Sequence, residues 1–154
     1  MLAAMRRASL VAVLALVLSA AACGGGGSKT LSKEEYGSRL NAICKDAAAQ
    51  EKEIGTPTSP SELVGKGPEL RAALDRAIAK AEKLKPPDEL KTAADKFLAE
   101  SKQLSSLLRR IVDAAGKNDV ATLARLGAQA QTIGTDAAAV GKQLGAPACA
   151  LAPG

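Results

Sequence analysis

The chain has 154 residues, with 21 lysines and arginines, 16 aspartates and glutamates, no histidine and a formal net charge of +5. The lack of histidine excludes Ser-His-Asp triads, histidine general bases and the commonest metal sites, so we expect no catalytic residue, no metal and no cofactor. The chain has one tyrosine, one phenylalanine and interspersed charges, so we expect no nucleic-acid partner.

Residues 1–22 have the pattern of a cleaved export signal. Arg6 and Arg7 form a charged start, an apolar run extends from Leu10 to Val17, and Ala20–Ala22 offers small residues for cleavage. This run is too short to cross a hydrocarbon core of about 30 Å, which indicates removal rather than retention in the membrane. General secretion fits the pattern better than the twin-arginine route.

Cys23 follows this stretch directly and is the predicted lipidation site of a bacterial lipoprotein. Its thiol would take a diacylglycerol, and cleavage before it would leave an acylated N-terminus. Residues 23–29 would then be the anchor cysteine and a Gly/Ser tether, with an r.m.s. reach of about 13–15 Å. We expect a protein anchored to the extracytoplasmic face of the cell membrane. Plain secretion is the alternative, because Ala20 stands where a lipobox usually has leucine and Ala20–Ala22 also satisfies the A-x-A rule.

The three cysteines are an odd number, and an exported protein rarely leaves a thiol unpaired. Acylation of Cys23 leaves Cys44 and Cys149, which we expect to form a disulfide that closes a loop of about 105 residues. On the chain-entropy model, such a loop contributes at most about 4.7 kcal/mol to stability. Two separate buried thiols are the alternative, while the absence of C-x-x-C spacing disfavours a metal or redox site.

Residues 30–154 are predicted to form one helical domain with a short C-terminal tail. The first helix is expected to begin after Ser32, where Glu35 three residues later completes a capping box. Apolar and small residues then recur in alternating steps of four and three, which is typical of a helix with one buried face. Gly55 and the residues after it end this helix.

The second helix is expected from Pro60 to Leu84, with Ser59 as its N-cap and Glu62 completing another capping box. The glycines and proline of residues 65–68 indicate a break or restart inside it. Two prolines after Leu84 end the helix, because proline cannot donate a backbone hydrogen bond and disfavours helix at the residue before it.

The third helix is expected from Asp88 to about Ala115, and Asn118 or Asp119 is the expected cap of the fourth helix, which ends before Gly145. Four apolar stripes joined by short connections place successive helices next to each other. The sequence therefore predicts an all-α fold, an antiparallel up-down four-helix bundle closed by one disulfide.

Three glycines in the fourth helix, Gly127, Gly134 and Gly141, recur every seven residues. Each interior glycine costs about 1 kcal/mol relative to alanine, so the row indicates a need for space. The expected reason is close approach by the backbone of the first helix. The alternatives are a groove for an apolar ligand such as a lipid chain, with Phe97 in its lining, and the docking of a partner helix.

A modest basic patch surrounds the turn at Pro86 and consists of Lys80, Lys83, Lys85 and Lys91. Such a patch is ordinarily a solvated surface. Contact with anionic lipid headgroups or wall polymers is the alternative interpretation.

Three short segments resemble those of small actinobacterial-type cell-envelope lipoproteins: Asn41–Cys44, Leu84–Leu90, and Leu144–Gly145 followed by Cys149. The resemblance covers nearly the whole mature chain and implies a helical envelope protein with no assigned activity. We expect a non-enzymatic structural or interaction module of the cell envelope, with an unidentified envelope protein as its partner. The alternative is a carrier or sensor that binds a small apolar ligand between its helices.

Overall fold

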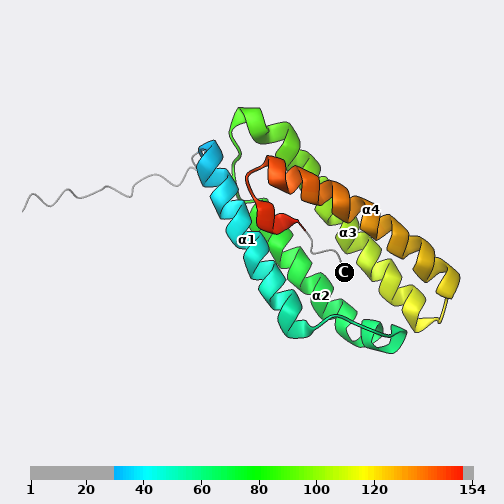
Figure 1. Cartoon of the computed structure of the whole chain (residues 1–154). Coiled ribbons are helices and arrows are strands. Elements are labelled where there is room, and N and C mark those ends of the chain that lie inside the picture. Colours follow the sequence, from blue (N-terminus) through cyan, green and yellow to red (C-terminus); the bar gives the residue numbers. More distant parts are fainter. Residues whose placement is uncertain (1–29, 151–154) are drawn as a thin grey trace, which may run out of the picture.

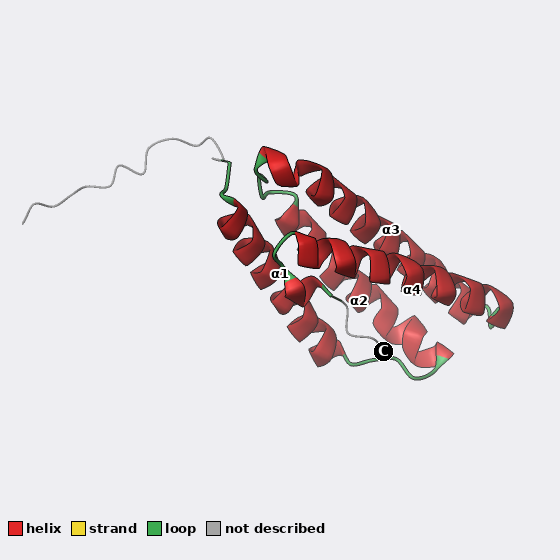
Figure 2. Cartoon of the chain, turned by 45° about the horizontal axis from the view of Figure 1, so that its top comes forward, coloured by secondary structure: helices red, strands yellow, loops and turns green. Residues whose placement is uncertain are grey.

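The computed structural model describes residues 30–150, which are helical throughout apart from turns and loops and include no strand (Figures 1 and 2). The elements are α1 (Lys33–Ile54), α2 (Pro60–Ala81), η1 (Asp88–Leu90), α3 (Lys91–Gly116), α4 (Val120–Gln143) and η2 (Pro147–Cys149), where η marks a 3₁₀ turn. The predicted all-α fold is confirmed. The expected signal segment, Cys23 and the expected tether lie outside the described residues.

The first helix begins and ends at the residues that the sequence predicts. The Ser32 hydroxyl accepts a hydrogen bond from the Glu35 backbone N–H at 3.1 Å, and the Glu35 carboxylate accepts one from the Ser32 N–H at 3.2 Å. The predicted capping box is therefore confirmed. At the other end, Gly55 has φ 81°, a conformation that glycine adopts without the steric cost of a side chain.

At the N-terminus of α2, only one of the two hydrogen bonds of the predicted capping box forms. The Ser59 hydroxyl accepts from the Glu62 N–H at 3.2 Å, as expected. The Glu62 carboxylate, however, accepts from the Thr58 N–H at 2.8 Å and from the Thr58 hydroxyl at 3.0 Å. The Glu62 carboxylate accepts from Thr58 instead of from the Ser59 N–H, because the backbone N–H and the hydroxyl of Thr58 can both donate to one carboxylate oxygen.

The second helix runs without interruption through Pro68, so the expected break at residues 65–68 is wrong. Pro68 has no N–H to give to the preceding turn, which weakens the helix at this point. Packing compensates, because Gly67 is buried against α3 and a Cβ built on it would collide with the Val112 side chain. The missing side chain at Gly67 thus allows α2 and α3 to lie close together.

Two predicted boundaries shift by three residues. The second helix ends at Ala81 rather than Leu84, because the Leu84 N–H donates to the Ala81 carbonyl at 3.0 Å in a closing turn. The predicted third helix starts at Asp88 with a 3₁₀ turn and becomes α-helical at Lys91. At α4 the cap is Asp119, one of the two expected residues.

Helices that follow one another in the sequence pack side by side: α1 on α2, α2 on α3, and α3 on α4. Direct contact between α1 and α4 is slight, and η2 contacts both of them. Figure 1 shows this C-terminal segment in red between α1 and α4. The fourth side of the helix group is therefore completed by residues 144–149 in place of extensive α1–α4 packing.

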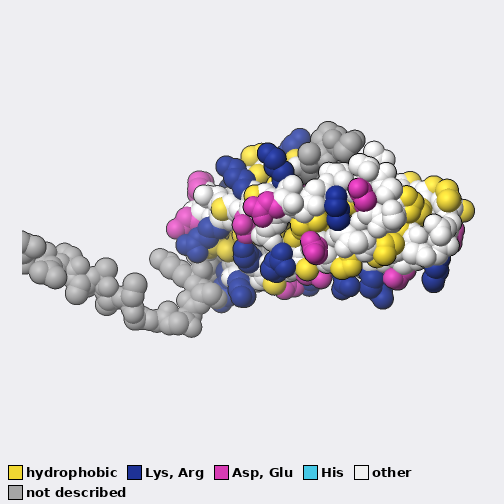
Figure 3. All heavy atoms as spheres, turned by 90° about the horizontal axis from the view of Figure 1, so that it is seen from below, with side chains coloured by type: hydrophobic (Ala, Val, Ile, Leu, Met, Phe, Trp, Pro, Cys, Tyr) yellow, Lys and Arg dark blue, Asp and Glu magenta, His cyan; other side chains and the backbone are white. Residues whose placement is uncertain are grey.

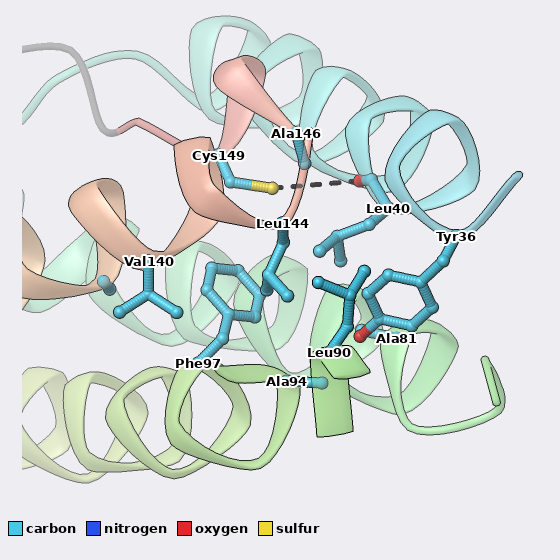
Figure 4. Packing of buried hydrophobic residues seen from close by; sticks show 11 residues of the cluster. Tyr36, Leu40, Ala81, Leu90, Ala94, Phe97, Val140, Leu144, Ala146 and Cys149 are labelled. Carbon is cyan, nitrogen blue, oxygen red and sulfur yellow. Dashed lines mark hydrogen bonds between the residues drawn. The ribbon is translucent and has the colours of Figure 1, made fainter. Parts of the chain in front are cut away.

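The main hydrophobic core lies at the end of the molecule where α1 begins and α4 ends. Figure 4 shows the Phe97 ring pointing between Val140 and Leu144, with the Tyr36 ring beside Leu90. All four helices and both 3₁₀ turns contribute to this core: Tyr36, Leu40, Ala81, Leu90, Ala94, Phe97, Ala137, Val140, Leu144, Ala146 and Cys149. Leu40 and Leu144 are completely buried, at 0% exposure, so the C-terminal segment belongs to the core itself.

Candidate functional site

A disulfide joins Cys44 of α1 to Cys149 of η2, with the two Cα atoms 5.0 Å apart. The predicted pairing is confirmed, and the alternative of two separate thiols is wrong. Cys149 is buried, and its sulfur contacts the Leu40 carbonyl oxygen at 3.8 Å (Figure 4). Nearby, the Ala148 N–H donates to the Asn41 side-chain oxygen at 2.8 Å. Together these contacts fix the C-terminal segment to α1.

Two glycines provide the space for this segment. A Cβ built on Gly37 of α1 would lie 2.8 Å from the Leu144 carbonyl oxygen, and one built on Gly141 of α4 would lie 2.8 Å from the Cys149 Cβ. Both distances are too short for real atoms. Residues 144–149 therefore pack against α1 at Gly37 and against α4 at Gly141, where neither helix has a side chain. We call this segment, together with the Cys44–Cys149 disulfide, the C-terminal clasp.

The three glycines of the predicted row have different surroundings. Gly127 is exposed, and a Cβ there would meet nothing within 4 Å, whereas Gly134 and Gly141 are buried. The atoms nearest to a Cβ on Gly141 belong to Ala146 and Cys149, so the segment after α4 lies closest to this glycine, while nothing approaches Gly127 as the sequence predicts for α1. Phe97 lies in the core cluster. The sequence did not single out Gly37, for which the only local signal is a glycine inside a strongly predicted helix.

The larger hollow described on the surface lies between α3 and α4 and has a volume of about 380 Å³. Its lining is Gln103, Ser106, Leu107, Arg110, Gln129, Thr132 and Ile133. These are amides, hydroxyls and one guanidinium around two apolar side chains. Neither Phe97 nor any glycine of the predicted row lines it, so this hollow is not the expected groove.

A second hollow, which we call the N-terminal hollow, lies where the described chain begins and has a volume of about 240 Å³. Its lining is Thr30, Leu31, Glu35, Arg39, Lys83, Leu84 and Lys85. The Leu31 N–H donates to the Lys85 carbonyl at 3.1 Å, which holds the entering chain against the segment after α2. The sequence indicated Lys83 and Lys85 as part of a basic patch. It missed Arg39, because only the fold places α1 beside the end of α2.

The best-formed ion pair connects α1 with α2 at the surface. The Lys80 ammonium donates to the Asp46 carboxylate at 2.6 Å, and Gln50 donates to the same oxygen at 3.3 Å. The hydrogen bond from Lys80 and its positive charge hold the pKa of Asp46 below its usual value of 3.8. Lys80, a member of the predicted basic patch, therefore forms an ion pair with Asp46.

Two other side chains, Asp119 and Tyr36, also have shifted pKa values that the structure explains. The Thr122 N–H donates to the Asp119 carboxylate at 3.0 Å at the start of α4, and this bond lowers the pKa of Asp119. Burial in the core, with a smaller contribution from the charge of Asp95, raises the pKa of the Tyr36 hydroxyl. Asp119 thus caps α4, and Tyr36 fills the core.

Within residues 30–150, no three or more cysteine and acidic side chains are grouped so that they could hold a metal ion. No helix in that range combines the length and the apolar character needed to cross a bilayer. Comparison with known protein families, with curated proteins and with solved structures found no match.

Proposed function

We propose that the protein is a lipid-anchored module of the cell envelope that displays an antiparallel helical domain outside the cytoplasm and catalyses no reaction. The observation that carries this proposal is the pairing of Cys44 with Cys149. It leaves Cys23, directly after the small residues Ala20–Ala22, as the cysteine available for acylation. A disulfide that closes a long loop also fits an oxidising compartment, because thiols in the bacterial cytoplasm are kept reduced.

The start of the domain supports the same proposal. The described domain begins at Thr30, seven positions after Cys23, and the intervening Gly/Ser tether reaches about 13–15 Å. An anchored domain would therefore stay close to the lipid headgroups. The hydrogen bond from the Leu31 N–H to the Lys85 carbonyl holds the entering chain against the segment after α2, which supports a domain anchored at that end.

An interaction role fits the described residues better than the carrier role. The carrier alternative depends on a groove formed by Phe97 with Gly127, Gly134 and Gly141. One of these glycines faces solvent and Phe97 is packed in the core, so the four do not line a common space. A stable helical surface held near the membrane is suited to binding an envelope protein, which we propose as the partner.

The lipid anchor is tested by expressing the full chain in a bacterium that processes lipoproteins and by separating the product with Triton X-114. We expect the wild-type protein in the detergent phase, and accumulation of its precursor when globomycin blocks the lipoprotein-specific peptidase. The Cys23→Ala variant, which keeps the Cys44–Cys149 disulfide, is the matched control and should lose both properties. A wild-type protein released into the medium and insensitive to globomycin would overturn the proposal.

The interaction role is tested by crosslinking in intact envelopes, followed by mass spectrometry of whatever is bound to the native protein. We expect one envelope protein to be crosslinked by the anchored form and lost with Cys23→Ala. A lipid recovered at one copy per chain from detergent-purified protein, with no crosslinked protein, would instead support the carrier alternative.

A further inference from the structure

We propose that the N-terminal hollow binds the phosphate group of an anionic lipid in the leaflet that holds the anchor. The inference deepens the proposed function and rests on it for the nearness of the membrane. Three cations, Arg39 of α1 with Lys83 and Lys85 of the segment after α2, line this one hollow. A phosphate accepts charge-assisted hydrogen bonds from such groups.

The three cations of the hollow are available to a ligand. In the part of the chain that the structure describes, no carboxylate lies within 4 Å of Arg39, Lys83 or Lys85, whereas Lys80 is paired with Asp46 at 2.6 Å. All three are exposed, so an approaching headgroup would not have to displace a buried partner.

The only acid in the lining, Glu35, is engaged in holding α1. Its carboxylate accepts from the Ser32 N–H and so belongs to the capping box. The positive end of the helix dipole also stabilises an acid in this first turn. The lining therefore carries three positive charges and one negative charge, and the negative carboxylate of Glu35 already accepts a hydrogen bond. This excess of positive charge favours the binding of an anion.

Two apolar side chains, Leu31 and Leu84, line the same hollow and are each partly buried. A phospholipid offers a phosphate next to a glycerol and the start of its acyl chains, so a cationic site with apolar walls matches it better than it matches free phosphate. Thr30, the first described residue after the expected tether, also belongs to the lining. The tether would thus bring the hollow itself to the headgroups.

The surface around the hollow carries both signs of charge. Figure 3 shows lysine and arginine side chains mixed with acidic ones at this end of the molecule. A general attraction of the whole domain to an anionic surface would therefore be weak, since charges of both signs offset one another and salt screens each of them beyond about 10 Å at ordinary ionic strength. The expected binding depends on the short-range contacts of Arg39, Lys83 and Lys85.

The test uses the mature chain from Cys23 to Gly154, attached to vesicles through the Cys23 thiol and a maleimide lipid. The chemical anchor replaces the biological one, so failure here is separate from failure of cellular acylation. Lysine acetylation by a soluble reagent, read by mass spectrometry, is compared between vesicles containing phosphatidylglycerol and vesicles of phosphatidylcholine alone. Lys117, in the α3–α4 turn, is the internal control.

We expect acetylation of Lys83 and Lys85 to slow about fivefold or more on phosphatidylglycerol vesicles, with Lys117 unchanged; a cation near an anionic surface contributes an effect of this order. Arg39→Gln should reduce the protection of Lys83, while Arg109→Gln on α3 should not. Equal acetylation on both vesicles, or equal slowing at Lys117, would overturn the proposal. Equal protection by soluble glycerol phosphate on phosphatidylcholine vesicles would overturn the choice of a membrane lipid.

Discussion

Gly37 is the residue at which a single methyl group has the largest expected effect on the C-terminal clasp. In Gly37→Ala the new Cβ would lie 2.8 Å from the Leu144 carbonyl oxygen and 3.1 Å from that of Gly145. Both obstacles are backbone atoms, so the segment itself must move. We expect the free energy of unfolding to fall by about 1–3 kcal/mol, the usual cost of overpacking, in urea denaturation followed by circular dichroism.

The control for this substitution is Gly127→Ala on α4, where the new Cβ would meet nothing within 4 Å. Here the change adds only helix propensity, and the free energy of unfolding should rise by about 0.5–1 kcal/mol. If both variants changed stability by the same amount, the close seating of residues 144–149 against α1 would be contradicted.

Asp46 provides a test of the ion pair between α1 and α2. The hydrogen bond and charge of Lys80 lower the pKa of Asp46 in the folded protein. The pair therefore stabilises the fold at pH values above the unfolded-state pKa near 3.8. This contribution is lost as the pH falls through the lower folded-state pKa. An NMR titration should place the Asp46 pKa below 3.8. Lys80→Gln should return it toward 3.8, and Lys83→Gln should leave it unchanged. An unshifted Asp46 in the wild-type protein would show that the pair does not form in solution.

For single residues, the sequence predicted those roles that depend on residues nearby in the sequence, such as helix capping. Ser32 with Glu35, and Asp119, cap helices as expected because a capping hydrogen bond spans only two or three residues. The roles of Gly37 and Arg39 could not be predicted. They depend on residues about 45 to 110 positions away, which come close only in the folded protein.

Among the elements, α2 contains the clearest conflict between local propensity and packing. Pro68 lies inside the helix, where proline costs about 3 kcal/mol relative to alanine, and it also restricts the unfolded chain by an amount of up to about 1 kcal/mol. Pro68→Ala should therefore raise the free energy of unfolding by about 1–2 kcal/mol. Urea denaturation measures the change.

The neighbouring exposed alanine offers a control for this prediction. Ala72→Pro, one turn further along α2, should destabilise the protein by about 3 kcal/mol or more, because it removes an interior helix N–H and its ring collides with the carbonyl four residues earlier. A decrease in stability with Pro68→Ala would contradict the view that Pro68 is a local cost. It would instead give the proline a packing role.

The expected break in α2 and the helix end at Leu84 show why element boundaries are harder to predict than the elements. Glycine and proline at residues 65–68 weaken a helix in isolation, but burial of Gly67 against Val112 favours its continuation. At the other end, a turn of the i to i+3 type takes over before the prolines begin. In both cases packing or turn geometry outweighs local propensity.

At the scale of the whole molecule, the disulfide joins residues 105 positions apart and holds the segment that fills the space between α1 and α4. The double variant Cys44→Ser with Cys149→Ser should lose up to about 4.7 kcal/mol of unfolding free energy, the limit for a loop of this length. Most of the helical signal should remain at low urea, because the packing of α2, α3 and α4 does not use this bond. Cys23→Ser is the control with the disulfide intact, and equal stability of the two would contradict the role of the clasp.

The sequence predicted four helices and one disulfide, because apolar periodicity and an odd cysteine count are properties of the chain alone. It did not predict that residues 144–149 occupy the fourth side of the molecule. Apolar periodicity indicates which faces of the helices are buried but not which element covers them, and Leu144 is fully buried in the segment after α4. The two hollows were beyond prediction for the same reason, since each is lined by more than one element.

The most direct test of the proposed lipid anchor is the intact mass of the native protein, measured without reduction after extraction from membranes. We predict a chain that begins at Cys23, carries a diacylglycerol and a further acyl chain on Cys23, and contains one disulfide between Cys44 and Cys149. An unacylated chain, a chain that begins at another residue, or a disulfide that involves Cys23 would contradict the account.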